Sequence, residues 1–135
     1  MADVHSPEAR SRNMAAIRSR NTKPEIAVRK IAHALGYRFR LSSRLPGRPD
    51  LVLPRYRKVI FVHGCFWHMH DCRHGRVKPA TRPEFWLKKL QQNVERDNRV
   101  QKLLAAVGWR SLVIWECWLA DPEKVRESIR SFISS

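Results

Sequence analysis

The chain has 135 residues, of which 27 are Lys or Arg and 12 are Asp or Glu, so its formal net charge is +15. This length fits one domain with one modest core. A net positive charge of this size on a small protein indicates a polyanionic partner, either nucleic acid or an anionic membrane. No apolar run approaches the ~20 residues that span a bilayer, and residues 1–20 lack the apolar region of a signal peptide. The sequence therefore favours nucleic acid over membrane, and it predicts a cytoplasmic protein with reduced thiols.

The first half of the chain is expected to hold two helices followed by three strands. A short basic helix is expected over residues 7–20. Thr22-Lys-Pro-Glu25 is typical of a capping box, and the helix that it opens should stop at Gly36. The three short strands are expected at residues 37–41, 50–53 and 58–62.

The second half is expected to hold two helices around one strand. A second Thr-x-x-Glu pattern, from Thr81 to Glu84, should open a long helix that ends near Gly108. Residues 111–116 are a candidate for a buried strand, and Asp121 should cap a last helix. This order of elements predicts an α/β sandwich with a mixed sheet.

A segment rich in His and Cys follows the third expected strand. Residues 63–74 hold two cysteines and four histidines in twelve positions, and the third cysteine follows the last strand. Zn²⁺ takes four tetrahedral ligands, usually thiolates and imidazoles. Cys65, Cys72 and Cys117 with one histidine would complete such a structural site, and His70 is our choice for that histidine. The alternative is a set of ordinary buried thiols with surface histidines.

Three acidic residues are candidates for a magnesium site, because a carboxylate near DNA is repulsive unless a cation lies between it and the phosphate. Mg²⁺ takes oxygen ligands and bridges to phosphate. Asp50 begins a strand after a proline, Glu25 stands at a helix start, and Asp97 interrupts an apolar helical stripe. Each has a simpler interpretation: a turn residue for Asp50, a cap for Glu25 and an exposed stripe edge for Asp97.

His63 and His68 are candidates for proton transfer, because His70 is assigned to zinc. Either could act as general base or as proton donor to a leaving group. A surface histidine is the simpler interpretation of each taken alone. Their position beside a strand end and a candidate metal-binding acid favours the catalytic interpretation.

Aromatic residues in basic surroundings are candidates for DNA contact. Phe66 and Trp67 lie inside the polar segment, where stacking on bases or wedging between base pairs is favoured over core packing. Core packing is expected instead for Phe85, Trp109 and Trp115.

Five strings of the sequence resemble the very-short-patch-repair (Vsr) DNA mismatch endonucleases. They are Arg-Ser-Arg-Asn-Met14, Leu-Pro-Gly-Arg-Pro-Asp50, Val-Ile-Phe-Val-His63-Gly-Cys-Phe-Trp-His68, Asn93-Val-Glu-Arg-Asp97 and Gly-Trp-Arg…Val-Ile-Trp-Glu-Cys117. The resemblance implies a restriction-endonuclease-like (PD-(D/E)XK) fold, a mixed β-sheet flanked by helices with a structural zinc site, in which Phe-x-His replaces the usual Glu-x-Lys. It also implies a single domain over residues 1–135, with a basic arm at 1–20 and a catalytic core at 21–135.

The resemblance further implies a strand-specific endonuclease. It would nick double-stranded DNA on the 5′ side of the T in T·G mismatches that arise by deamination of 5-methylcytosine, and so initiate very short patch repair. Such an enzyme would be bacterial and cytoplasmic, would act as a monomer at the nucleoid without contacting membrane, and would be linked in function to a cytosine-5 DNA methyltransferase.

Residue roles follow from the same resemblance. Magnesium would be bound directly by Asp50 and the backbone carbonyl of Val62, and His68 would be the general base. The residues acting through metal-bound water would be Glu25, His63 and Asp97. The zinc ligands would be Cys65, His70, Cys72 and Cys117. The residues contacting DNA would be Phe66, Trp67 and Trp86 from the major groove, Met14 in the minor groove, and Lys89 and Asn93 at the mismatched pair. The sequence departs from the family pattern at Val62, where Thr is expected, and at Met69 and Asp71, which interrupt a run of histidines.

Two alternatives stay open at this point. One is a sequence-specific nicking or restriction-type endonuclease with no mismatch requirement. The other is a non-catalytic zinc module that only binds DNA, against which the Pro-Asp strand and the position of Asp97 argue.

Overall fold

The computed structural model describes residues 21–76 and 81–135, so the expected basic helix, with Met14, lies outside the described residues. The described elements, in chain order, are α2 (Lys23–Ala34), β1 (Leu51–Leu53), the 3₁₀ turn η1 (Pro54–Tyr56), β2 (Lys58–His63), α3 (Pro83–Ala106), β3 (Arg110–Trp115), the 3₁₀ turn η2 (Glu116–Ala120) and α4 (Pro122–Ser134). No helix in these two ranges is long and apolar enough to cross a membrane.

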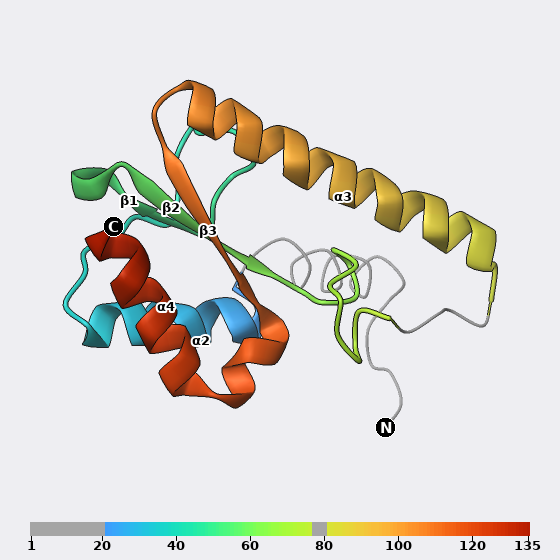
Figure 1. Cartoon of the computed structure of the whole chain (residues 1–135), viewed down its shortest axis with the longest axis horizontal. Helices are drawn as coiled ribbons and strands as arrows, with labels where there is room; N and C mark the ends of the chain where they lie inside the picture. The colour runs from blue at the N-terminus through green and yellow to red at the C-terminus, as the bar shows by residue number, and fades with distance from the viewer. Residues whose placement is uncertain (1–20, 77–80) are drawn as a thin grey trace, which may run out of the picture.

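The described strands form one mixed sheet in the order β1-β2-β3. β1 runs antiparallel to β2, and β2 runs parallel to β3. Helices α2 and α4 cover one face of the sheet, and the long helix α3 crosses the other (Figure 1). The expected α/β sandwich with a mixed sheet is therefore confirmed.

The core lies on both faces of the sheet because side chains alternate along each strand. Ile60 of β2 faces α2 and α4 and packs with buried residues of those helices, such as Val28 and Ile129. Its neighbours Val59 and Phe61 pack on the opposite side with Leu104 of α3. This double packing holds β2 rigidly in the middle of the molecule.

The expected strand at 37–41 is wrong. Only Arg40 pairs, in an isolated bridge with Val52. Its N–H donates to the Val52 carbonyl at 2.8 Å and its carbonyl accepts from the Val52 N–H at 2.9 Å. The ladder does not extend further because β1 has only three residues before Pro54, which has no N–H to donate.

The second expected capping box is also wrong. α3 begins at Pro83, its N-cap is Arg82 at φ +52°, and no side chain caps it. Proline disfavours the right-handed helical conformation at the residue before it, so the helix begins one residue later than the pattern suggests. Thr81 therefore lies outside the helix.

The first capping box and the last cap are largely confirmed. The Thr22 side chain accepts from the N–H of Glu25 at 3.3 Å, whereas the Glu25 carboxylate accepts from the N–H of Asn21 at 2.7 Å, one residue before the expected donor. The Asp121 side chain accepts from the N–H of Lys124 at 3.4 Å. The expected buried strand near 111–116 is only partly buried, with Ile114 alone fully enclosed, because β3 is at an edge of the sheet.

Candidate active site and metal cluster

Both functional clusters are built at the carboxyl ends of the parallel strands β2 and β3. His63 ends β2, Trp115 ends β3, and the two residues are partners in the strand register. Cys65 and Cys117 each follow two residues later. Because parallel strands end at the same edge of a sheet, this register brings together residues from distant parts of the chain.

The candidate catalytic residues line one cleft of about 570 Å³. They come from the first turn of α2, the residue before β1, the end of β2, the loop after β2 and the middle of α3. The set comprises Glu25, Asp50, Val62, His63, His68 and Asp97. All six residues that the sequence suggested for catalysis or magnesium binding are therefore brought together.

Asp50 is held at the floor of this cleft by backbone hydrogen bonds. Its carboxylate accepts from the Val62 N–H at 2.6 Å, and its own N–H donates to the Ile60 carbonyl at 3.0 Å. Burial raises the pKa of Asp50 to about 6, the Val62 hydrogen bond opposes this rise, and the charge of Glu25 adds to it. A carboxylate in this environment is short of a positive partner.

His68 and Asp97 are joined directly, which the sequence did not indicate. The His68 Nδ1 lies 2.5 Å from an Asp97 carboxylate oxygen, and each side chain is 20% exposed. The contact leaves the other ring nitrogen, Nε2, available for proton transfer. An imidazole oriented by a carboxylate is a recurring arrangement for a general base.

His63 stacks face to face on His68, with ring centroids 3.8 Å apart and planes inclined by 5°. Burial lowers the pKa of His63 to about 4, the neighbouring His68 lowers it further, and Asp97 opposes the shift. His63 is therefore neutral at neutral pH, and its Nδ1 is buried without a hydrogen-bond partner among the described residues.

His63, His68 and Asp97 bring possible ligand atoms within 4.8 Å of one another. The stacking nevertheless argues against one ion shared by the two histidines. An imidazole lone pair lies in the plane of its ring, so two parallel stacked rings do not aim at a common point. Asp50 is accordingly the better candidate for direct metal binding in this cleft.

The four residues expected to bind zinc, Cys65, His70, Cys72 and Cys117, form a second group, which we call the metal cluster. Their candidate ligand atoms all lie within 4.8 Å of one another. Cys65 is fully buried, and the Cys117 sulfur lies 3.5 Å from the His70 Nδ1. Burial raises the pKa of Cys65 to about 12, so without a cation this group is a neutral thiol. Three sulfur atoms and one imidazole nitrogen at these separations fit a closed tetrahedral metal site.

Gly75 closes the loop around this cluster, a role that sequence reasoning missed. A Cβ atom at Gly75 would lie 1.9 Å from the His70 carbonyl oxygen. The Gly75 N–H also points at the Cys72 sulfur, at 3.4 Å. The feature of the sequence that could have indicated this role is a single glycine shortly after Cys72.

Gly75→Ala is therefore expected to disrupt the metal cluster, because the clash is with backbone that cannot rotate away. We expect loss of bound metal and destabilisation on the order of 2–4 kcal/mol. Metal content and melting temperature check this. Gly36→Ala is the control: its φ of +89° makes alanine strained there, but no atom lies within 4 Å of an added Cβ, so it should lower the melting temperature without loss of metal. A Gly75→Ala protein with full metal content would show that the loop adapts.

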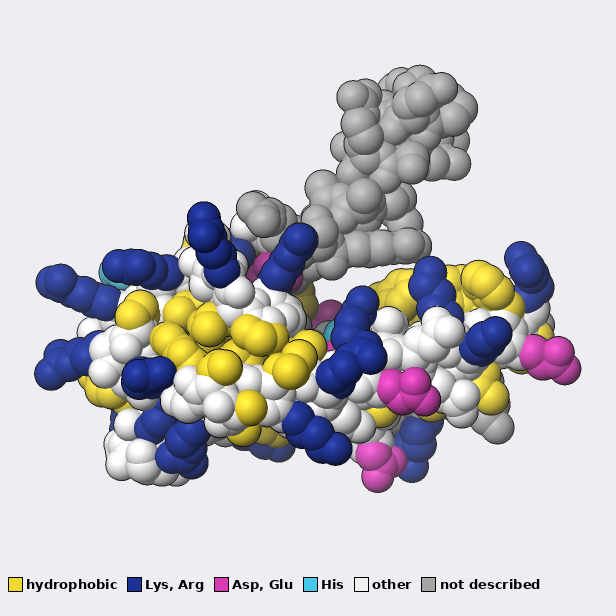
Figure 2. Space-filling model, turned by 90° about the horizontal axis from the view of Figure 1, so that it is seen from above, with side chains coloured by type: hydrophobic (Ala, Val, Ile, Leu, Met, Phe, Trp, Pro, Cys, Tyr) yellow, Lys and Arg dark blue, Asp and Glu magenta, His cyan; other side chains and the backbone are white. Residues whose placement is uncertain are grey.

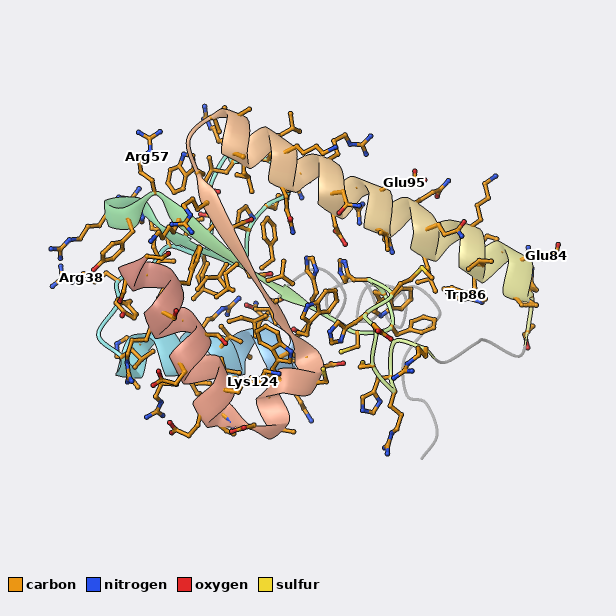
Figure 3. All side chains as sticks on the ribbon, viewed as in Figure 1. Arg38, Arg57, Glu84, Trp86, Glu95 and Lys124 are labelled. Atoms are coloured by element: carbon orange, nitrogen blue, oxygen red, sulfur yellow. The ribbon has the colours of Figure 1, made fainter. Side chains whose placement is uncertain are left out.

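Apart from Met14, which is outside the described residues, the residues expected to contact DNA lie where the loop after β2 meets α3. Phe66 and Trp67 have ring centroids 5.1 Å apart, and Trp86 lies 5.7 Å from Trp67. Asn93 donates to the Trp67 carbonyl at 3.1 Å, and the Lys89 ammonium lies 5.7 Å from the centre of the Trp86 ring. Figure 3 shows Trp86 on the side of α3 that faces this loop. We call Phe66, Trp67 and Trp86 the aromatic cluster.

The expected core packing of Phe85 is wrong, since its side chain is 48% exposed and an Arg82 guanidinium lies over its ring. It stands in the first turn of α3, beyond the reach of the sheet. Trp109 packs against the core as expected. Trp115 is half-buried at the strand end, where it stacks on His70.

Two arginines of the cleft were not singled out from the sequence. Arg48 and Arg96 line the same cleft as the acids. Arg48 stands at φ +49° just before the Pro-Asp pair. Lys and Arg side chains are spread along the α3 side of the molecule, with few Asp and Glu among them (Figure 2). The cleft therefore opens onto a basic surface suited to DNA phosphates.

An α/β fold with a carboxylate-histidine cleft beside an aromatic cluster on a basic surface suits a nuclease that acts on DNA. A profile of the family described as DNA mismatch endonuclease Vsr matches residues 2–74. The chain is 50% identical over 128 residues to the DNA mismatch endonuclease Vsr of Escherichia coli (strain K12), covering 94% of this chain and 81% of that protein. The chain belongs to the Vsr family and is a DNA endonuclease.

Other relatives carry a different description. The Type II nicking enzyme V.XorIIP of Xanthomonas oryzae pv. oryzae is 48% identical over 134 residues, which cover 98% of each chain. The Type II nicking enzyme V.NmeAIP of Neisseria meningitidis is 39% identical over 134 residues, 98% of this chain and 95% of that protein. Membership of an endonuclease family favours an enzyme over the non-catalytic zinc module.

Proposed function

We propose that this chain is a Mg²⁺-dependent nicking endonuclease with a restriction-endonuclease-like fold. It cuts double-stranded DNA on the 5′ side of the T in T·G mismatches left by deamination of 5-methylcytosine, and so initiates very short patch repair. The observation that carries this proposal is the convergence of Asp50, His68 and Asp97 in one cleft beside the aromatic cluster. We further propose that one domain over residues 1–135 acts as a monomer, in functional association with a cytosine-5 DNA methyltransferase.

The residues of the cleft fit Mg²⁺. Asp50 is a partly buried carboxylate with a raised pKa and lies near a second acid, Glu25. Mg²⁺ prefers oxygen ligands and keeps several waters, which His63, on the lining of the same cleft, could contact. We propose that Asp50 and the Val62 carbonyl hold the ion, with Glu25 and His63 acting through water. When bound, the ion would stabilise the negative charge that develops on the phosphate.

Proton transfer falls to His68 in this proposal. Asp97 accepts from Nδ1 of His68 and so fixes the ring, while Nε2 takes the proton of the attacking water. Arg48 and Arg96 neutralise DNA phosphates at the mouth of the same cleft. In this proposal Asp97 orients the base, in addition to the contact with water that the family resemblance implies.

The second cluster is proposed to hold a structural zinc ion. Cys65, Cys72, Cys117 and His70 supply four ligands and leave no position open for substrate. Such an ion would tie the loop after β2 to the end of β3. It would thereby fix Phe66 and Trp67, which lie between the first and second cysteine ligands.

The aromatic cluster is proposed to wedge into the duplex at the mismatch, together with Met14 from the basic arm and with Lys89 and Asn93 at the mismatched pair. Wedging costs a few kcal/mol per base step. A T·G wobble pair is weaker than a matched pair, so that cost is lower at the mismatch. The wedge therefore converts a difference in base-pair stability into a difference in affinity.

Trp67→Ala and Trp86→Ala are accordingly expected to weaken binding to a T·G duplex by on the order of 1–3 kcal/mol, and to weaken binding to the matched T·A duplex less. Affinities for both duplexes at two salt concentrations check this. Trp109→Ala is the matched control, because Trp109 is also half-buried but packs against the core away from the cluster. An equal loss of affinity for both duplexes would show that the aromatic cluster stacks on bases without distinguishing the mismatch.

The second candidate function is a sequence-specific nicking enzyme with no mismatch requirement. Several relatives are named Type II nicking enzymes, which favours it. Nicking of matched and T·G duplexes over a panel of flanking sequences separates the two functions. Efficient nicking of matched duplexes within one sequence context would select this second candidate.

A further inference from the structure

The Trp115 ring contacts the metal cluster and both candidate catalytic histidines. It stacks on His70, with centroids 4.1 Å apart and planes inclined by 13°. It also makes a T-shaped contact with His63, at 5.2 Å and 76°. A second T-shaped contact joins it to His68, at 6.4 Å and 72°. One indole therefore contacts a ligand of the metal cluster and both catalytic imidazoles.

The contacts continue beyond Trp115 into the active site. His63 stacks on His68 at 3.8 Å, and His68 is bonded through Nδ1 to Asp97 of α3. An unbroken series of ring contacts thus joins the metal cluster to the proposed general base. The series crosses from β3 to β2 and then to the loop after β2.

The backbone explains why these rings meet. Trp115 and His63 are register partners at the ends of parallel strands, so their side chains leave the sheet on the same face. The following loop folds back over them, as the His68 N–H donates to the Gly64 carbonyl at 3.2 Å and the His70 N–H donates to the Cys65 carbonyl at 3.0 Å. His68 and His70 thereby approach the indole from the same loop.

The proposed base needs this support because it sits on a loop. Its one side-chain hydrogen bond among the described residues fixes Nδ1 against Asp97, but a single bond leaves the ring free to turn about that contact. Stacking on His63 defines the plane of the His68 ring, and the contact with Trp115 limits where His63 can lie. Loss of the indole would open space beside both imidazoles.

We propose that Trp115 is a positioning residue, which transmits the geometry of the metal cluster to the catalytic histidines and holds His68 in the orientation that proton transfer requires. This inference rests on the proposed role of His68 as general base. The indole itself does not contact the reacting atoms.

The test compares Trp115→Ala and Trp115→Phe with Trp118→Ala. Trp118 is also half-buried, but it packs on the opposite core beside α4. Single-turnover nicking of a T·G duplex in Mg²⁺ is measured over a range of enzyme concentrations. We expect Trp115→Ala to lower the maximal rate by roughly 10–100-fold, with the half-saturating concentration and the zinc content little changed. Trp115→Phe should restore most of the rate, because a phenyl ring can still fill the gap.

A readout independent of activity is the set of histidine ring resonances in ¹H–¹⁵N spectra of the free protein. Those of His63 and His68 should shift in Trp115→Ala and stay in place in Trp118→Ala. Unshifted resonances would overturn the proposal. So would an equal loss of rate in Trp118→Ala, or a loss of rate in Trp115→Ala that merely follows its loss of zinc. A wild-type protein that did not nick T·G duplexes would contradict the proposed function instead, and the spectra would still decide the role of Trp115.

Discussion

Asp50→Asn is expected to lower the nicking rate by at least about 10³-fold, because an amide NH₂ replaces one oxygen of the carboxylate that we propose binds the metal. DNA affinity should stay the same or rise, since 27 basic residues carry the attraction and a negative charge is removed. The rate and the affinity are measured on the same T·G duplex. The rate should therefore fall without any loss of binding.

The same substitution should stabilise the fold in the absence of metal. The pKa of Asp50 is raised from 3.8 to about 6, so the folded state disfavours its ionised form. The wild-type protein then loses stability as the pH rises from about 4 through about 6, by about 3 kcal/mol in total. Asn carries no charge to bury, so Asp50→Asn should melt higher than wild type at pH 8 in a chelator and lose this advantage near pH 4. Mg²⁺ should raise the melting temperature of wild type only.

Glu95→Gln is the matched control, because it removes the same charge from the outer side of α3 (Figure 3). It should change neither the nicking rate nor the response to Mg²⁺. An Asp50→Asn protein that nicks at a rate near wild type would remove Asp50 from its proposed role. A variant that bound DNA poorly would show instead that the substitution disturbs the fold.

Cys72→Ser is expected to reduce zinc from about one ion per chain to a small fraction, because a hydroxyl replaces a thiolate ligand. Of the two thiols that remain, Cys65 is buried with a pKa of about 12 and is poorly suited to ionise without the ion. Since metal binding is coupled to folding, stability should fall by on the order of 3 kcal/mol or more. Elemental analysis of protein purified without added metal and thermal melting are the measurements.

His74→Ala separates metal ligation from the general effect of altering this loop. His74 is exposed and lies outside the four-residue cluster. It should keep its zinc and melt close to wild type. A Cys72→Ser protein that was stable and nicked normally would show that the cluster is a set of ordinary thiols.

The grouping of the three cysteines with His70 could be predicted from sequence, because residue types that bind zinc are recognisable without knowledge of the fold. Cys65, Cys72 and Cys117 are the only cysteines of the chain, and an odd number of cysteines indicates a metal site more than a set of disulfides. The candidate acids were found for a similar reason, since a carboxylate on an apolar helical stripe is unusual.

The contacts within the site could not be predicted, because they depend on how distant elements meet. The pairing of His68 with Asp97 and the position of Trp115 require the β2–β3 register and the placement of α3. The failed expectations have local causes. Proline delays the start of α3 beyond Thr81, and a very short β1 leaves the segment around Arg40 with one bridge instead of a strand.

The central claim is most directly tested by mapping the cut on end-labelled T·G and T·A duplexes of one sequence in Mg²⁺. Each strand is labelled separately, so both the strand and the position of the cut are read. The account predicts a single nick on the 5′ side of the mismatched T, no cut in the opposite strand, and no comparable nick in the T·A duplex or in a chelator. Equal nicking of the T·A duplex, or cutting of both strands, would contradict it.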